Sequence, residues 1–186
     1  MKFANGKGEV LNIYGLVTQL PDEQWGPGNM FRNFKILLDR SLDDEIFSFI
    51  NLNLHTDRWS RWSRPEGLQI IEYANSRQVP LWTVERVLDF LDTRAASRFT
   101  GLVWRHSRLS FQLQVPAPGQ AVTLLFPRRF NKKYVLKILQ DGIQRSCAVG
   151  RIKGADCAFL TVAPGTHTIV VAYGEGASPA ALPQDR

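Results

Sequence analysis

One histidine in this sequence stands among residues that could take part in acid–base chemistry. His55 follows an apolar, strand-like run that starts at Phe47, and a carboxylate, Asp57, comes two positions later. Imidazole changes protonation near neutral pH, and a neighbouring carboxylate stabilises its charged form. His55 is therefore a candidate general acid, with Asp57 as the residue that tunes it. The alternative is a polar residue at a strand end, bonded to backbone and solvent.

Three tryptophans near this histidine could bind sugar. Trp59 and Trp62 lie three positions apart in the stretch RWSRWSR, and Trp25 lies in an earlier loop that also contains Asp22. Aromatic rings stack on the C–H faces of pyranose rings, and arginine pairs with hydroxyls or carboxylates. The alternative for Trp59 and Trp62 is that they pack over a sheet edge as lid residues. Asp22 could line the same groove, although a solvated acid is the ordinary expectation in a loop.

The elements that would position these residues alternate in type. Between Glu9 and Arg94, three strand-like apolar runs alternate with three stretches of helical periodicity. Such alternation is typical of parallel α/β architecture, in which functional residues lie at the carboxyl ends of strands, as His55 would. A closed barrel needs eight strand–helix units. We therefore predict an α/β segment over residues 1–95 that is either a small open sheet or a partial, barrel-like parallel β/α structure.

The pattern changes near residues 94–99. From there on, short alternating apolar runs are separated by Gly-, Pro- and Asp-containing turns, and no helical pattern intervenes. This predicts an all-β antiparallel sandwich over 96–175, followed by a disordered Gly- and Pro-rich tail over 176–186. Cys147 and Cys157 match neither a metal motif nor a disulfide framework, and we expect buried free thiols.

The charge is uneven along the chain. The net charge is +6, and after Ala95 only four acids oppose twelve Lys and Arg. An anionic partner could explain this asymmetry, but we favour a solvated basic sheet face, including the turn with Arg128, Arg129, Lys132 and Lys133 around Phe130. Nucleic-acid binding is not expected, because no recognised motif accompanies these residues. Trp104 and Phe111 are expected in the sandwich core.

The sequence predicts where in the cell the protein is located only on a condition. No apolar run approaches the roughly 20 residues of a membrane span, so no membrane partner is expected. The first ten residues, MKFANGKGEV, contain no apolar signal-peptide core. This predicts a cytoplasmic protein if the chain is complete, and an extracytoplasmic one remains open if it belongs to a longer protein.

Several of these stretches together resemble a known family. FSFINLNLHTD, followed by EGLQIIEYANSR, QVPLW and TVERVLDFLDTR, resembles the end of the polysaccharide deacetylase (NodB-homology) barrel, whose last strands carry a hydrophobic-x-His motif. EVLNIYGLVTQLPDE would correspond to an earlier barrel strand and its active-site loop. The segment from FTGLVW to VVAY is similar to the β-sandwich appended to some bacterial members. The resemblance implies a carbohydrate-active protein with a polysaccharide or oligosaccharide partner.

The resemblance also implies which chemistry this chain would lack. In the family, an Asp and two His hold a divalent metal such as zinc, a second Asp is the base, and the His of the late motif is the acid. Only this last role maps here, onto His55 in Leu52-Asn53-Leu54-His55. The other histidines, His106 and His167, lie in the sandwich region and form no H-x-x-x-H pair. We therefore expect no metal or other cofactor in this chain.

Two functional hypotheses follow. The first is a fragment or relic of a polysaccharide deacetylase, resembling a hydrolase but inactive alone. The second is a non-enzymatic β-sandwich module that binds glycan or a protein. Because a partial barrel leaves sheet edges unpaired, we also expect a homo-oligomer or dependence on a missing upstream segment.

Overall fold

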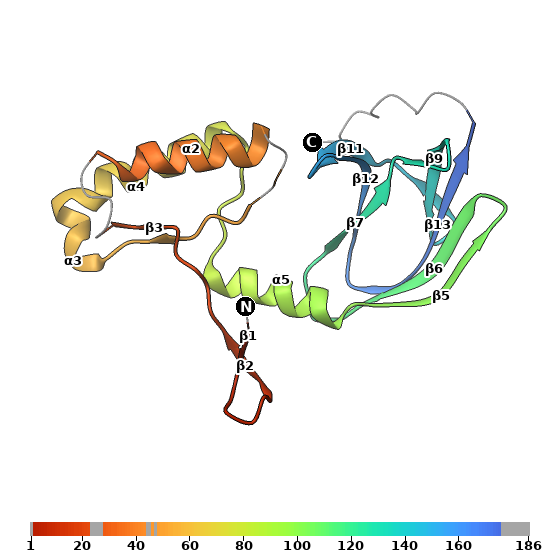
Figure 1. Cartoon of the computed structure of the whole chain (residues 1–186), viewed down its shortest axis with the longest axis horizontal. Coiled ribbons are helices and arrows are strands. Elements are labelled where there is room, and N and C mark those ends of the chain that lie inside the picture. The colour runs from red at the N-terminus through yellow and green to blue at the C-terminus, as the bar shows by residue number, and fades with distance from the viewer. Residues whose placement is uncertain (1, 23–27, 44–45, 47, 176–186) are drawn as a thin grey trace. The chain divides into compact units, whose positions relative to one another are not determined.

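The structure is a computed structural model that describes residues 2–22, 28–43, 46 and 48–175. The chain divides between Trp82 and Thr83 into two compact units, called here the first and second unit. As Figure 1 shows, the first unit contains short strands and several helices, and the second contains one helix and many strands. The fold is therefore a mixture of helices and mostly antiparallel strands. The predicted tail over 176–186 lies outside the described residues.

The first unit is built around two packed helices. Its elements are β1 (Lys2–Ala4), β2 (Val10–Tyr14), β3 (Leu20–Pro21), α2 (Met30–Asp43), β4 (Leu52–Asn53), α3 (Thr56–Arg58), the π-helical turn η1 (Trp59–Ser63) and α4 (Arg64–Ser76). β1 and β2 form an antiparallel hairpin, and β3 pairs with β4 in parallel. The buried core joins β3 to α2 and α4 through Leu20, Met30, Phe34, Leu38, Ile70 and Ala74.

The strands of this unit are shorter than the sequence predicts. Parallel pairing in the described residues is limited to two residues each of β3 and β4, so the barrel-like segment is not confirmed. The apolar run from Glu9 to Val17 predicts a buried strand. This prediction is wrong, because Val10 is 71% exposed and Val17 is 73% exposed. This run joins a local hairpin instead. The Asn5 side chain closes its turn by accepting hydrogen bonds from the backbone of Lys7 and Glu9.

The two helices form where helical spacing predicts them. Spacing predicts one apolar face of α2 with Met30, Phe34, Leu37 and Leu38. Met30, Phe34 and Leu38 are buried as predicted, but Leu37 is exposed. α4 begins beside Pro65, which suits the first turn of a helix. Helical spacing predicts Leu68 and Ile71 on its inner side, but both are exposed. Gly67, Ile70 and Ala74 face the core instead. The small residues allow close packing of the helix.

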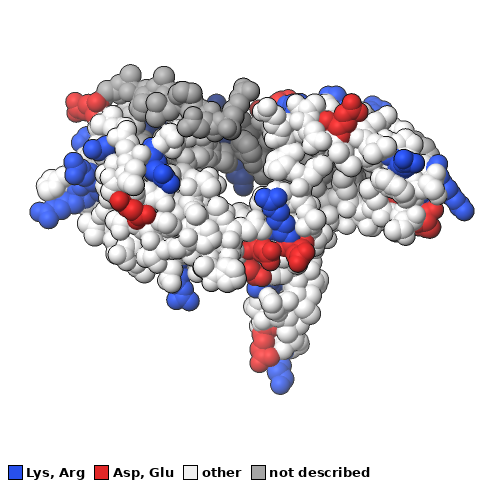
Figure 2. Space-filling model, turned by 180° about the vertical axis from the view of Figure 1, so that it is seen from behind, with Lys and Arg blue, Asp and Glu red and all other residues white. Residues whose placement is uncertain are grey.

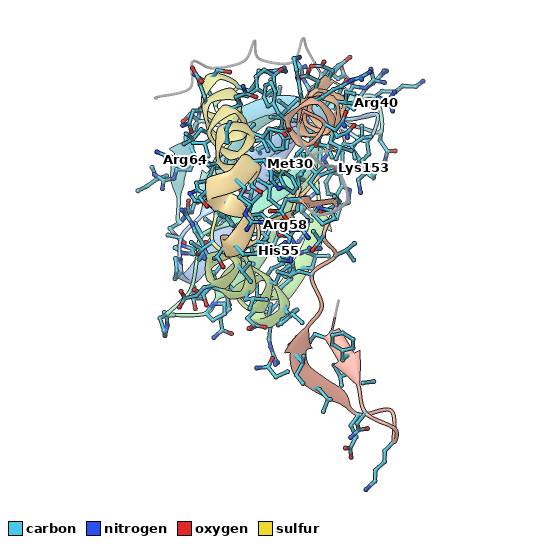
Figure 3. All side chains as sticks on the ribbon, turned by 90° about the vertical axis from the view of Figure 1, so that its left-hand side faces the viewer. Met30, Arg40, His55, Arg58, Arg64 and Lys153 are labelled. Carbon is cyan, nitrogen blue, oxygen red and sulfur yellow. The ribbon has the colours of Figure 1, made fainter. Side chains whose placement is uncertain are left out.

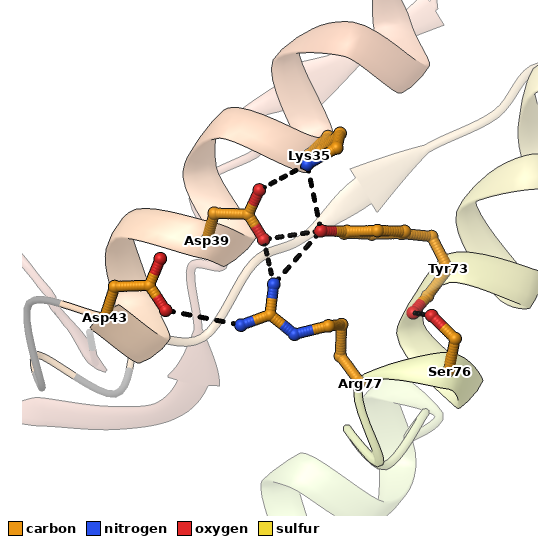
Figure 4. A network of polar contacts seen from close by, with 6 residues as sticks. All are labelled: Lys35, Asp39, Asp43, Tyr73, Ser76 and Arg77. Carbon is orange, nitrogen blue, oxygen red and sulfur yellow. Dashed lines mark hydrogen bonds and ion pairs between the residues drawn. The ribbon is translucent and has the colours of Figure 1, made fainter.

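A polar network joins the outer sides of α2 and α4 (Figure 4). The Tyr73 hydroxyl donates a hydrogen bond of 2.6 Å to Asp39, and the Lys35 ammonium donates to both residues. Arg77 pairs with Asp39 and with Asp43. Hydrogen bonds from Lys35 and then Tyr73 lower the pKa of Asp39. Because every member already has partners within the network, we interpret it as a link between the helices.

The second unit begins with a capped helix and continues as strands. The helix is α5 (Val84–Ala96), and the Thr83 hydroxyl accepts a hydrogen bond from the Arg86 backbone at its start. The strands are β5 (Arg98–Arg105), β6 (Arg108–Val115), β7 (Val122–Pro127), β8 (Arg129–Phe130), β9 (Lys133–Gln140), β10 (Ile143–Arg145), β11 (Ala148–Ile152), β12 (Ala155–Val162) and β13 (Gly165–Gly174).

These strands form two antiparallel sheets with one core. The larger sheet, visibly curled in Figure 1, has the order β10-β9-β13-β6-β5, with β8 paired to β9, and the smaller has the order β11-β12-β7. Alternate residues of both sheets meet in the core, among them Leu113, Phe126, Ile138, Val162 and Ile169. This arrangement is consistent with the predicted sandwich.

Helix α5 groups with the strands rather than with the helices before it. The Gln120 backbone donates to the Thr93 hydroxyl at 3.2 Å, and the Gln120 side chain donates to the Arg86 carbonyl at 2.7 Å. The division of the chain therefore precedes α5, whereas the sequence pattern changes after it. The spacing of apolar residues shows where helix gives way to strand. It does not show which part of the chain a helix packs against.

Both cysteines of the second unit are free thiols. Cys157 is buried and Cys147 is partly buried, and burial raises the pKa of each thiol. Charged side chains of both signs are interspersed on the face shown in Figure 2, without a single large patch of one sign. Among the described helices, none combines the length and apolar character that a membrane span requires.

Candidate functional site

The parallel pair β3–β4 brings together two residues that are far apart in the sequence. Leu20 lies opposite Leu52, and Pro21 lies opposite Asn53. Asp22 follows β3 directly, and His55 comes two residues after the end of β4. Because parallel strands end at the same edge of a sheet, both residues lie there, at the position where α/β proteins usually place functional groups.

Asp22 is the centre of a compact hydrogen-bond group. Its side chain is fully buried, with 0% of its surface exposed. One carboxylate oxygen lies 2.6 Å from Nδ1 of His55. The other accepts hydrogen bonds from the His55 backbone N–H at 2.9 Å and from the Ser63 hydroxyl at 2.7 Å. The expectation that Asp22 is a solvated loop acid is therefore wrong.

These donors decide the charge of the buried carboxyl group. Burial alone would raise the pKa of Asp22, but the hydrogen bonds from Ser63 and His55 outweigh it and lower the pKa to about 2. Asp22 is thus ionised at neutral pH, and its charge stabilises the protonated imidazole of His55. The His55 side chain remains 41% exposed. The group can therefore hold an oriented imidazole whose Nε2 could exchange a proton with a bound molecule.

The carboxylate that pairs with His55 is not the one that the sequence suggested. Asp57 lies in the first turn of α3 and is exposed. Asp22, 33 residues away in the sequence, contacts the imidazole instead. Asp57 was the candidate because it is close to His55 in the sequence. The parallel pairing of β3 with β4 instead brings Asp22 into contact with the imidazole.

Two further residues that support the site were not identified from the sequence. Ser63 ends the π-helical turn η1, and it is fully buried with its hydroxyl directed at Asp22. Glu66 is buried in the first turn of α4, where its two carboxylate oxygens accept hydrogen bonds from the backbone N–H groups of Gly28 and Phe31, at 2.6 and 2.7 Å. Glu66 thus caps α2 from a neighbouring helix. No local sequence signal distinguishes either residue from a solvated polar residue.

The structure separates the three candidate tryptophans. A Cβ atom added to Gly67 would lie 2.9 Å from the ring of Trp59, so this indole packs directly on helix α4. Trp62 is partly exposed, and the guanidinium carbon of Arg58 lies 5.7 Å from the centroid of its ring. Trp25 lies outside the described residues. Trp62 is therefore the better supported of the two described sugar-stacking candidates.

The second unit shows a different aromatic group. Phe111 is buried in the core as predicted, but Trp104 is 47% exposed. Trp104 contacts Phe130 and Tyr173, with ring centroids 5.2 and 5.6 Å apart. Of the other histidines, His167 bonds Asp141 at 2.8 Å and the Ala163 carbonyl at 3.1 Å. His167 therefore links β13 to the turn after β9.

Two further observations concern the function of the site: possible metal ligands and similarity to known proteins. Within residues 2–22, 28–43, 46 and 48–175, no group of three or more His, Cys, Asp or Glu side chains is placed to hold a metal ion. No family model, curated protein or solved structure matches the chain. The site must therefore be interpreted from its own geometry.

The lowered pKa of Asp22 predicts acid sensitivity of the first unit. A carboxyl group with a pKa of about 2 in the folded chain and an ordinary value of 3.8 stabilises the fold above pH 4. This contribution, about 2 kcal/mol, is lost as the pH falls from 4 to 2. Urea unfolding at several pH values, monitored by the NMR signals of first-unit residues, measures it. Ser63→Ala should move the loss to higher pH, and an unchanged profile would contradict the assignment.

Proposed function

We propose that this chain is a carbohydrate-active fragment or relic, similar to the last part of a polysaccharide deacetylase barrel with its β-sandwich. In this proposal β3, β4 and the helices after them are the remainder of a parallel β/α barrel. His55 is the proton donor of the former or shared site. Asp22 and Ser63 are positioning residues that act through it.

The observation that carries the proposal is the contact between buried Asp22 and Nδ1 of His55 at the ends of two parallel strands. A carboxylate on Nδ1 stabilises the imidazolium form of the ring, in which the opposite nitrogen also carries a proton, as proton donation to a leaving amine requires. The residues concerned lie in LPDE and LNLH, which belong to two of the stretches that carry the resemblance. Metal-assisted attack on an acetyl group would need ligands from another polypeptide segment, since this sequence has only three histidines and no H-x-x-x-H pair.

A second candidate function is supported by the second unit. Trp104 and Phe130 are both partly exposed and in ring contact, and Arg129, Lys132 and Lys133 lie next to Phe130 in the sequence. Aromatic and basic side chains together suit glycan or protein binding. Under this alternative the second unit binds without chemistry, and His55 has a structural role.

One titration separates the two candidates. Acetylated chitooligosaccharide or acetylated xylan is added to the full chain with the His55 imidazole and the tryptophan indoles observed by NMR. We expect signals of His55 and Trp62 to move, and no acetate to be released in the presence of zinc. Shifts confined to Trp104 would support the alternative and contradict the proposal.

Two further outcomes also count against the proposal. Metal-dependent acetate release by the purified chain would show that the chain is an active deacetylase rather than a relic. A titration in which neither unit responds would remove carbohydrate binding altogether.

A further inference from the structure

The helical segment that follows His55 carries mostly positive charge on its exposed side chains. The segment from α3 to the start of α4 contains Arg58, Arg61 and Arg64 against one exposed acid, Asp57. None of these three arginines forms an ion pair with a described residue. The negative charge of Asp22 does not offset them, because this carboxylate is buried and already bonded to His55 and Ser63. The exposed surface of this segment is therefore cationic.

Arg58 is the arginine best placed to act at the site. Its backbone N–H donates to the carbonyl of His55 at 3.1 Å, so it lies one helical turn after the histidine. Figure 3 shows His55 and Arg58 next to each other at the start of this helical stretch, with Arg64 further along it. The Arg58 side chain is half-buried, and its guanidinium lies over the Trp62 ring at 5.7 Å.

Stacking on the Trp62 ring restricts the Arg58 guanidinium in a way that favours binding of a carboxylate. An arginine held against an indole loses little further side-chain freedom on binding, and its N–H edge remains suited to two parallel hydrogen bonds with a carboxylate. The same indole offers an apolar edge to a sugar ring. A carboxylate and a pyranose are joined in one molecule in acidic sugars such as uronic acids.

We propose that the ligand of the His55 site is a carboxylated glycan, with Arg58 binding the carboxylate and Trp62 the adjoining sugar ring. This inference rests on the proposed function and specifies its ligand class. Neutral glycans would contact the tryptophan but would leave the arginine without an anionic partner.

The test uses a pair of ligands that differ only in charge. Hexamers of galacturonic acid and their methyl esters are titrated into the full chain by calorimetry. We expect the acid to bind at least tenfold more tightly than the ester, as one charge-assisted bidentate contact implies. Arg58→Gln should remove most of this preference. Arg40→Gln, which removes the same charge from α2 at a position that Figure 3 shows away from His55, should leave it unchanged.

The other outcomes are equally decisive. If acid and ester bind equally, or if neither binds, the inference is wrong. If Arg40→Gln weakens binding as much as Arg58→Gln, the binding reflects overall charge, which also overturns it. The proposed function fails separately, when neutral acetylated glycans do not perturb His55. Circular dichroism of each variant checks that the fold is retained.

Discussion

Asp22→Asn is expected to lower the unfolding free energy of the first unit by about 2 kcal/mol, because it replaces the charged, buried acceptor of three hydrogen bonds with a neutral group. Asparagine has the shape of aspartate, but it offers one acceptor oxygen where three donors now converge. Its amide group must then face a donor, either the imidazole or the Ser63 hydroxyl. Urea unfolding monitored by NMR signals of α2 and α4 measures the loss.

The same substitution should change the protonation of His55. Without the neighbouring negative charge, the protonated imidazole loses its main electrostatic support. We expect half-protonation of the ring at a lower pH in Asp22→Asn than in the parent chain, as followed by the imidazole proton signals. A structural defect alone would lower stability without moving this titration.

Asp57→Asn is the matched control. Asp57 is exposed and lies two residues from His55, so its removal should change stability by less than about 0.5 kcal/mol. If both variants lose the same stability, or if Asp57→Asn moves the imidazole titration further, the tuning residue suggested by the sequence is the correct one and Asp22 is not.

The helices could be predicted from the sequence because their signals are local. α2 follows the spacing of Met30, Phe34 and Leu38, and α5 begins at a threonine that caps it. The alternating runs after residue 98 likewise predicted antiparallel strands. Each of these signals is contained within a few helical turns or one strand. Local free-energy preferences and the final packing agree at these positions.

The site could not be predicted in the same way because its contacts are not local. Strands of two residues, β3 and β4, leave almost no periodicity, yet their pairing determines that Asp22 rather than Asp57 meets His55. Ser63 reaches the same carboxylate only because the chain passes through a π-helical turn. The histidine itself was identifiable, whereas its partners depend on how distant segments pack.

Glu66→Ala is expected to lower the unfolding free energy of the first unit by about 3 kcal/mol, since it leaves two partly buried backbone N–H groups without their charged acceptor. Glu66 accepts from Gly28 and Phe31, which precede and begin α2, and it comes from α4. The carboxylate also faces the positive end of the α2 dipole, so the loss combines hydrogen bonding with charge. Urea unfolding again measures the change.

Glu72→Ala tests whether this cost is specific to the cap. Glu72 is exposed on the same helix, so its replacement removes an equal charge and should change stability by less than about 0.5 kcal/mol. Glu66→Gln should fall between the two, because its amide oxygen can serve only one of the two donors well. Hydrogen exchange of the Phe31 amide should accelerate in Glu66→Ala and stay slow in Glu72→Ala. Equal losses in the two alanine variants would mean that Glu66 of α4 does not hold the start of α2.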